Sequence, residues 1–400
     1  MPFEVPSSWV WTTGGEISQS ILYGVSESAK SQGTYRLLRI TDIQDNKVNW
    51  DTVPFTDYEN EKAEAYLLKD GDILFARTGA TVGKSYLVNN LKEKAIYASY
   101  LIRVQTNHYV LPAFVKYFFE SGFYWEQVLD NSVGIGQPNV NGTILSNLEL
   151  PIPPIMEQKR IVKELGEWLS IIDKIEESKG RIQKVISLAK SKVLDLAIHG
   201  KLVPQDPTDE PATELLKRIN PKAEITCDNG HYQKLPEGWC ECCFDDIFNI
   251  KMGQSPNGSS INHQQGVEFH QGKILFGDKY LKQSDMFTDA PTKLATPNSL
   301  LLCVRAPVGV VNITQREICI GRGLCSLKPN AAINLNYAYH ALTTYQSDFE
   351  SKSTGSTFKA ISGSIIRNEV FALPPLQEQY RIVSKIEEIF AQLDAIEASL

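Results

Sequence analysis

The chain has 400 residues, of which 42% are hydrophobic and 22% charged, so it is long enough for two or three domains of ordinary globular composition. It lacks a run of about twenty apolar residues and a secretion signal at its N-terminus, so we expect a cytoplasmic protein without a membrane span. The net charge of −7 does not exclude a nucleic-acid partner, because phosphate binding depends on local basic patches.

Residues 1–152 predict a first domain of mixed strands and helices. A helical stretch at 112–129 and a loop at 132–142 rich in glycine and asparagine follow the strands. This order is typical of a compact α/β domain with irregular loops. The β-rich runs are 35–43, 71–77, 84–88 and 95–104.

Residues 153–200 predict one long helix. Its apolar residues recur at alternating steps of four and three, which is the seam of a left-handed coiled coil. A helix over residues 155–198 would be roughly 65 Å long at 1.5 Å per residue, and its seam needs a partner helix. The seam residues are Ile161, Leu165, Trp168, Ile172, Ile175, Ile182 and Ile186.

The partner is predicted to lie in the same chain, because the start of the long helix is written twice. Residues 153–162 read PPIMEQKRIV and residues 374–383 read PPLQEQYRIV, and the second copy continues in the same phase. A Pro-Pro pair fits a helix start and sets a boundary there. A helical hairpin that merely closes a core is the alternative. In the second helix, 374–400, the seam residues are Ile382, Ile386, Ile389, Leu393 and Ile396.

Residues 201–234 predict a linker with a short helix at 212–219, and residues 235–373 a second domain that repeats the first. LPEGW answers VPSSW, and NSLLLCVRAPVG answers GDILFARTGATVG. We therefore predict an α+β fold in which two repeated α/β domains are separated by two long antiparallel coiled-coil helices. The second helix has no counterpart of 180–219, so we expect it to be short or to be completed by another subunit.

A repeated scaffold with different side chains suits two reading domains for two targets. DNA offers such targets one helical turn, roughly 34 Å, apart along one face. Base edges and phosphates are contacted by Arg, Lys, Asn, Gln, Ser and Thr, and loops rich in these types occur at the same two places in both copies. Arg77 and Arg305 are expected to align. For each residue alone, a solvated loop explains the pattern equally well. The candidate DNA-binding residues are Arg77, Thr78, Lys84, Gln137, Asn139 and Asn141 in the first domain, and Lys251, Gln254, Ser255, Arg305, Arg322, Thr357 and Lys359 in the second.

Other kinds of site are poorly supported. The segment GATVGKS at 79–85 is one residue too short between its glycines for a phosphate-binding P-loop. The seven cysteines all lie between Cys227 and Cys325, and their odd number favours reduced thiols. The group Cys227, His231, Cys240, Cys242 and Cys243 lacks the paired spacing of a structural zinc site. We expect no catalytic residue, no metal and no cofactor in this chain.

The order of domain, long helix, domain and long helix resembles the specificity (S) subunit of type I restriction-modification enzymes. The segments GDILFARTGATVGK, GQPNVNGTILSNLELPIPPIMEQKRIV and LDLAIHGKLVPQDPTDEPATELLKRI are similar to that family's boundary sequences, and the resemblance covers essentially the whole chain.

The resemblance implies two target recognition domains that read the two halves of a split, asymmetric DNA site, with the antiparallel helices fixing the gap. It also implies two modification subunits, which use S-adenosylmethionine to methylate adenine, and two restriction subunits, which use ATP and Mg. Apolar residues left on the long helix, including Leu169, Ile171 and Leu188, are expected to hold the modification subunits. The alternative is a coiled-coil scaffold, or a truncated or silent specificity copy without DNA reading.

Overall fold

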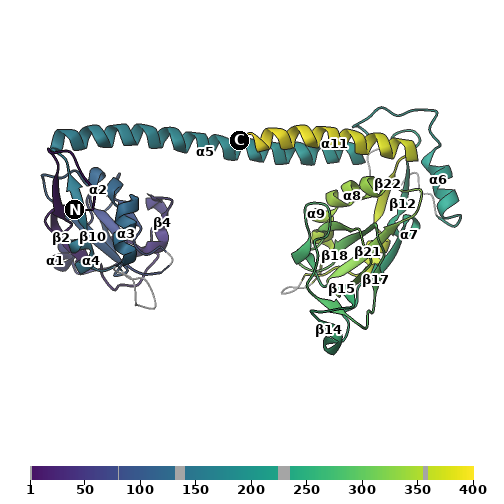
Figure 1. Ribbon diagram of the computed structural model, residues 1–400, viewed down its shortest axis with the longest axis horizontal. Coiled ribbons are helices and arrows are strands. Elements are labelled where there is room, and N and C mark those ends of the chain that lie inside the picture. The colour runs from purple at the N-terminus through teal and green to yellow at the C-terminus, as the bar shows by residue number, and fades with distance from the viewer. Residues whose placement is uncertain (1, 80, 131–139, 224–234, 355–358) are drawn as a thin grey trace. The chain divides into compact units, whose positions relative to one another are not determined.

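The computed structural model describes residues 2–79, 81–130, 140–223, 235–354 and 359–400 (Figure 1). It divides into two compact units, Met1–Glu176 and Glu177–Leu400. The long helix α5 (Ile155–Ile198) contains the boundary between them, and its bounds agree with the predicted long helix.

Within its described residues, the first unit is built on a four-stranded antiparallel sheet of order β2-β10-β7-β8, and a second sheet has the order β6-β3-β9. The helices are α1 (Asn60–Ala63), α2 (Pro112–Phe118), α3 (Gly122–Asp130) and α4 (Gly142–Asn147). The strands are β1 (Val10–Thr13), β2 (Ser18–Tyr23), β3 (Tyr35–Leu38), β4 (Ile43–Gln44), β5 (Lys47–Val48), β6 (Phe55–Thr56), β7 (Ile73–Ala76), β8 (Ser85–Leu87), β9 (Ala95–Tyr97), β10 (Leu101–Thr106) and β11 (Glu149–Ile152).

Strand β7 is buried on both of its faces. Ile73 and Phe75 point to one side and pack with Phe114 and other residues of α2 and α3, whereas Leu74 points to the other side and packs with Tyr86. Side chains alternate along a strand, so a run that is apolar throughout is buried on both faces. The predicted helical stretch 112–129 is divided in the structure, where α2 ends before α3 begins.

The second unit repeats this plan, with a four-stranded antiparallel sheet of order β13-β21-β18-β19 among its described residues. A further sheet has the order β14-β16-β15-β20-β17. The helices are α6 (Ala212–Ile219), α7 (Phe244–Ile247), α8 (Leu335–Thr344), α9 (Gln346–Lys352), α10 (Gly363–Arg367) and α11 (Leu376–Ala398). The strands are β12 (Cys240–Cys243), β13 (Phe248–Met252), β14 (Ile261–Asn262), β15 (Val267–His270), β16 (Phe287–Thr288), β17 (Leu294–Ala295), β18 (Ser299–Cys303), β19 (Val311–Thr314), β20 (Ile318–Ile320), β21 (Leu324–Pro329) and β22 (Val370–Leu373).

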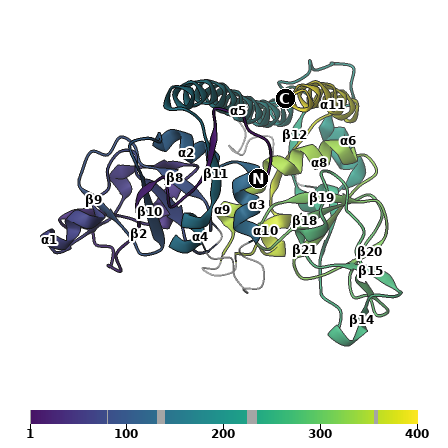
Figure 2. The ribbon, with the colours of Figure 1, turned by 60° about the vertical axis from the view of Figure 1, so that its left-hand side comes forward.

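The two sheets correspond strand by strand, which confirms the internal repeat. The strand that opens each unit also pairs with the strand that closes it: β1 with β11, and β12 with β22. In the second unit, α8 lies between α11 and the sheet and contacts both, as two views show (Figures 1 and 2).

The repeated Glu-Gln pair at the helix starts has a structural cause. In the first copy, Gln158 accepts a hydrogen bond from the backbone nitrogen of Leu111 (2.8 Å) and donates to the carbonyl of Pro153 (2.9 Å). In the second copy, Gln379 accepts from the nitrogen of Asn334 (2.8 Å) and donates to its own Pro-Pro segment. Each glutamine therefore ties the start of a long helix to the loop that precedes a helix of its domain.

Helix α11 lies antiparallel to the C-terminal half of α5, within the second unit (Figure 1). Lys179 donates to the backbone oxygen of Leu400 (3.0 Å), and Lys190 pairs with Asp394 (2.5 Å). Further along α5, Ala197 shares a core with residues near the start of α11. Residue numbers thus rise along one helix as they fall along the other, and the predicted antiparallel arrangement is confirmed.

Candidate nucleic-acid interface

In the first unit, strands β2 and β7 of the main sheet end, and strand β10 begins, on the same side of the sheet, where several loops meet. Tyr23 pairs with Ile102 at the end of β2, and Ala76 pairs with Leu101 at the end of β7. We call this the first loop edge. Beyond it, the Arg77 nitrogen donates to the Tyr100 carbonyl (3.0 Å), and the Arg77 carbonyl accepts from the nitrogen of residue 140 (3.1 Å).

The side chains at the first loop edge are aromatic and cationic. The guanidinium of Arg77 lies 5.2 Å from the centre of the Tyr23 ring, a cation–π contact that holds it against the sheet. The Tyr23 hydroxyl accepts from the nitrogen of Gly142 (2.8 Å). Tyr100 has 62% of its surface exposed. Exposed aromatic rings beside an arginine can contact base edges, thymine methyl groups and the backbone of DNA.

The second loop edge has the same backbone frame. Met252 pairs with Cys325, and Cys303 pairs with Leu324, at the ends of β13 and β18. Beyond them, the nitrogen of Val304 donates to the carbonyl of residue 323 (3.0 Å), and the carbonyl of Val304 accepts from the nitrogen of residue 361 (3.0 Å). These bonds match those of Arg77 in the first unit one for one.

This match shows that Arg77 corresponds to Val304 and Thr78 to Arg305. The prediction that Arg77 and Arg305 align is therefore wrong by one residue. Neighbouring residues of an extended segment point to opposite sides, so the two arginines do not have equivalent directions. Residue identity alone favours the alignment of Arg77 with Arg305, whereas the hydrogen-bond register aligns Arg77 with Val304.

The remaining candidate residues of the first unit have different structural roles. Lys84 is exposed in the turn between β7 and β8, and Thr78 is half-buried. The side-chain oxygen of Asn141 accepts from the nitrogen of Ile144 (2.9 Å) and so caps α4. Ser362 caps α10 in the same way in the second unit. This pair of caps explains one repeated polar position without DNA. Gln137 and Asn139 lie outside the described residues.

Most candidates of the second unit gather at its loop edge. The Ser255 hydroxyl accepts from the nitrogen of Arg322 (3.4 Å), which joins the loop after β13 to the loop before β21. Arg305 pairs with Ala360 in an isolated bridge, next to Lys359. The described candidates with exposed side chains are Lys251, Gln254, Arg305, Arg322 and Lys359. Thr357 lies outside the described residues.

Sequence reasoning missed Tyr23 and Tyr100, which the structure places at the first loop edge. Strand β2, which carries Tyr23, was not among the predicted strands, although its sequence SQSILY mixes polar and apolar residues as an edge strand does. Tyr100 lies inside the predicted β-rich run 95–104, but only the sheet register places it at the same loop edge as Tyr23.

The predicted seam residues fall into two groups. Ile186, which has 4% of its surface exposed, lies between the two lysines of α5 that contact α11, and Ile382 and Ile386 are buried in the core of the second unit. Ile389 and Leu393 are half-buried, and Ile161 is half-buried against the core of the first unit. The seam residues that are exposed are Leu165, Trp168, Ile172, Ile175, Ile182 and Ile396.

The exposed part of α5 in the first unit forms a contiguous apolar surface, which we call the apolar stripe. Its members recur at helical spacing and cover one side of the helix. Apolar surface of this extent on a helix is typical of a protein-binding site. The residues of the apolar stripe are Leu165, Trp168, Leu169, Ile171, Ile172 and Ile175.

Local contacts and burial explain the shifted pKa values of several ionisable groups in the second unit. Burial opposes the ionisation of Glu268, but hydrogen bonds from Arg316, the nitrogen of Ser284 and His270 outweigh burial and lower its pKa to about 2. Burial also raises the pKa of the Cys303 and Cys325 thiols to about 12, so these cysteines are poor nucleophiles and ligands.

Among the residues that the structure describes, no group of three or more His, Cys, Asp or Glu side chains could hold a metal ion. Cys240 and Cys242 are buried in strand β12. Cys227 and His231, the other members of the group weighed as zinc ligands, lie outside the described residues. In the same described part of the chain, no helix is long and apolar enough to cross a membrane.

Comparison with known proteins agrees with this architecture. A family model described as the type I restriction modification DNA specificity domain matches residues 22–185 and 236–400, one match for each loop edge. The chain belongs to the family of type I restriction-modification specificity subunits. Its two domains are therefore the target recognition domains of such a subunit.

Relatives of this specificity subunit match over nearly its whole length. The putative type I restriction enzyme MjaX specificity subunit of Methanocaldococcus jannaschii is 29% identical, over 96% of this chain and 88% of the relative. The EcoKI specificity subunit of Escherichia coli is 24% identical, over 98% of this chain and 84% of the relative.

Two solved structures are similar to this specificity subunit. A chain from a structure titled for complex assembly and conformational transition of the type I R-M system is 25% identical, with a TM-score of 0.77 over 100% of this chain and 94% of that chain. The HsdS subunit of Thermoanaerobacter tengcongensis, 24% identical with a TM-score of 0.57 over 100% of this chain and 93% of that chain, shares the fold.

Proposed function

We propose that each target recognition domain reads one half of a split, asymmetric DNA site through its loop edge. One observation carries this proposal: the two loop edges have the same backbone hydrogen bonds but different side chains. Tyr23 stands where the second domain has Met252, and Tyr100 stands where it has a glycine. A common frame gives two domains the same way of docking, and different side chains give them different base contacts.

The chain itself works without catalysis in this proposal, and without a cofactor of its own. Two modification subunits, which use S-adenosylmethionine, methylate adenine in the site that the chain selects. Two restriction subunits, which use ATP and Mg, cut the DNA in the cytoplasm. The antiparallel helices fix the gap between the two half-sites.

The apolar stripe supports the docking of a modification subunit on α5. Trp168 has 58% and Ile175 has 61% of its surface exposed. Removing this apolar surface from water on binding would contribute favourable free energy. Aromatic and aliphatic side chains of this kind are the anchors of protein–protein interfaces.

Co-purification with the cognate modification subunit, followed by mapping of methylated adenines on DNA of known sequence, tests the proposal. We expect one split, asymmetric motif that is methylated only when this chain is present. Replacing residues 5–150 with those of a relative should change one half of the motif and leave the other intact. A stable complex without sequence preference would instead identify the chain as a coiled-coil scaffold.

A further inference from the structure

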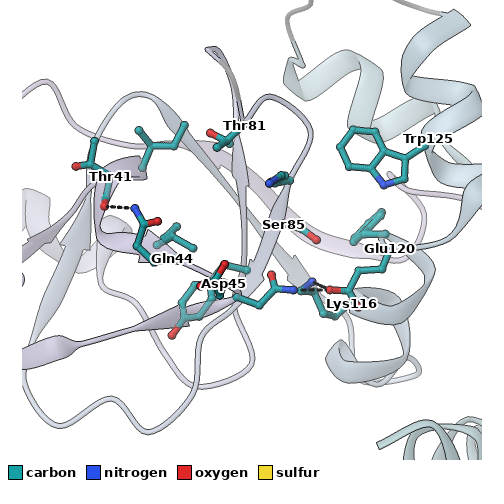
Figure 3. Close-up of a pocket in the computed structure, with 15 residues that line it drawn as sticks. Thr41, Gln44, Asp45, Thr81, Ser85, Lys116, Glu120 and Trp125 are labelled. Carbon is teal, nitrogen blue, oxygen red and sulfur yellow. Dashed lines mark hydrogen bonds and ion pairs between the residues drawn. The ribbon is translucent and has the colours of Figure 1, made fainter. Parts of the chain in front are cut away.

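A cavity of about 660 Å³ opens in the first domain beside the loop edge (Figure 3). Three separate segments form it: residues 40–46, the hairpin of β7 and β8, and the end of α2 with α3. In Figure 3, Gln44 lies on one side, Trp125 and Glu120 lie on the other, and Ser85 lies between them. A volume of this size is in the usual range for a small-molecule site, roughly 300–1,000 Å³.

Ser85 brings a buried polar group to the wall of the cavity. Ser85 has 5% of its surface exposed, and its oxygen has no hydrogen-bond partner among the described residues. Buried polar groups in native proteins nearly always have a partner, so we take this hydroxyl as a group to which a molecule in the cavity would bond. A serine hydroxyl can both donate and accept, which suits a ligand with a mixed hydrogen-bonding edge.

The side of the cavity formed by α2 and the residues after it holds a fixed carboxylate. Glu120 accepts hydrogen bonds from Lys116 and from the side chain of Asn46 (2.8 Å). Lys116 is itself buried, with 8% of its surface exposed, so the pair is held in place before any ligand arrives. The side-chain nitrogen of Gln44 donates to the carbonyl of Thr41 (2.9 Å). This bond fixes the Gln44 amide and leaves its side-chain oxygen as an acceptor. The cavity therefore offers oriented acceptors.

A flat surface and a cation complete the lining. The indole of Trp125 lies on the wall next to Glu120, and the exposed Lys84 stands in the hairpin turn. Each chemical part of a nucleotide has a complementary group in this lining. Its base has a flat π face for Trp125 and an edge of donors and acceptors for Ser85, Gln44 and Glu120, and its phosphate matches Lys84.

We propose that this cavity binds a single unstacked nucleotide. The base stacks on Trp125 with its edge toward Ser85, and the phosphate lies at Lys84. The nucleotide comes either from DNA held at the adjacent loop edge or from the free pool. The DNA source rests on the proposed function, whereas the affinity of the cavity for a nucleotide does not.

Titration of the full chain with dAMP, dGMP, dCMP and TMP, followed by saturation-transfer NMR, tests the cavity. Ser85→Ala removes an unpaired hydroxyl, so its thermal unfolding should match that of the wild type while the affinity for the bound mononucleotide falls roughly 3- to 10-fold. Gln44→Ala, at an exposed position, should weaken binding similarly. Ser20→Ala is the control, because Ser20 bonds to Gln105 away from the cavity. Absence of signal from all four mononucleotides, or equal binding by all variants, overturns the proposal.

A second measurement separates the two sources. Duplexes of the mapped site, with the fluorescent base 2-aminopurine at one position at a time, report unstacking as a rise in fluorescence. A rise that Ser85→Ala reduces assigns the nucleotide to DNA, and mononucleotide binding without any rise assigns it to the free pool. If the chain with its modification subunit shows no sequence preference, the proposed function fails, while the mononucleotide titration still decides the cavity.

Discussion

Replacing Ile172 and Ile186 by aspartate, one at a time, should separate two roles of the long helix. Ile186 is buried in the described structure, so Ile186→Asp removes a packed side chain and places a carboxylate there. Loss of a core isoleucine costs about 2–5 kcal/mol, which lowers the Tm of a domain of this size by roughly 5–15 °C. Ile172 has 47% of its surface exposed, so Ile172→Asp should change the free energy of unfolding by no more than about 0.5 kcal/mol.

Calorimetric unfolding of the isolated chain and co-purification with the modification subunit give the two readouts. We expect Ile172→Asp to abolish assembly at normal stability, and Ile186→Asp to lower stability directly. Lys174→Asp is the control, because it changes the charge of the same helix at an exposed position outside the apolar stripe. Full assembly of Ile172→Asp, or a loss of stability equal to that of Ile186→Asp, would refute the assignment of the apolar stripe as a docking surface.

Four further substitutions probe the second unit and the helix starts. Lys190→Ala should cost about 0.2–1 kcal/mol in urea unfolding, because its ion pair with Asp394 is partly exposed, and a double-mutant cycle of the two residues should show their coupling. Gln158→Ala and Gln379→Ala should each cost about 1–3 kcal/mol in the same assay, since each leaves a backbone nitrogen unpaired. Burial, with a smaller effect of a nearby lysine, lowers the pKa of His340 to about 4, so the unfolded chain binds this proton more tightly. Stability is complete above pH 6.5 and is lost as the pH falls toward 4, by about 1.4 kcal/mol at pH 5.5, and His340→Phe should abolish this part of the pH dependence of Tm.

The helices could be predicted from the sequence because their signals are local. A Pro-Pro pair excludes a preceding helix, and a heptad of apolar residues continues through the whole of α5. The short helix at 212–219 coincides with α6, which also begins just after a proline. The repeat itself was visible because the helix starts use Glu-Gln, and the structure explains that pair by the bonds of Gln158 and Gln379.

The sites could not be predicted to the same degree, because they depend on strand register. A shift of one residue is enough to exchange Arg77 for Thr78 as the counterpart of Arg305, and no property of the letters reveals it. The cavity at Ser85 is formed by three segments that are distant in sequence. The unpaired hydroxyl that marks it is visible only once burial is known.

The two loop edges offer a structural basis for the proposed reading of two unlike half-sites. The caps at Asn141 and Ser362 and the backbone bonds beyond β7 and β18 are common to both domains, so they fix how each edge is presented. The first edge carries large aromatic rings at Tyr23 and Tyr100. The second edge has a glycine at the position equivalent to Tyr100, and it carries a set of exposed basic side chains. Rings contact methyl groups and base faces, while arginine and lysine bind guanine edges and phosphates. Because the frame is fixed independently of these side chains, the proposed function lets each domain change its target without altering the docking of the other.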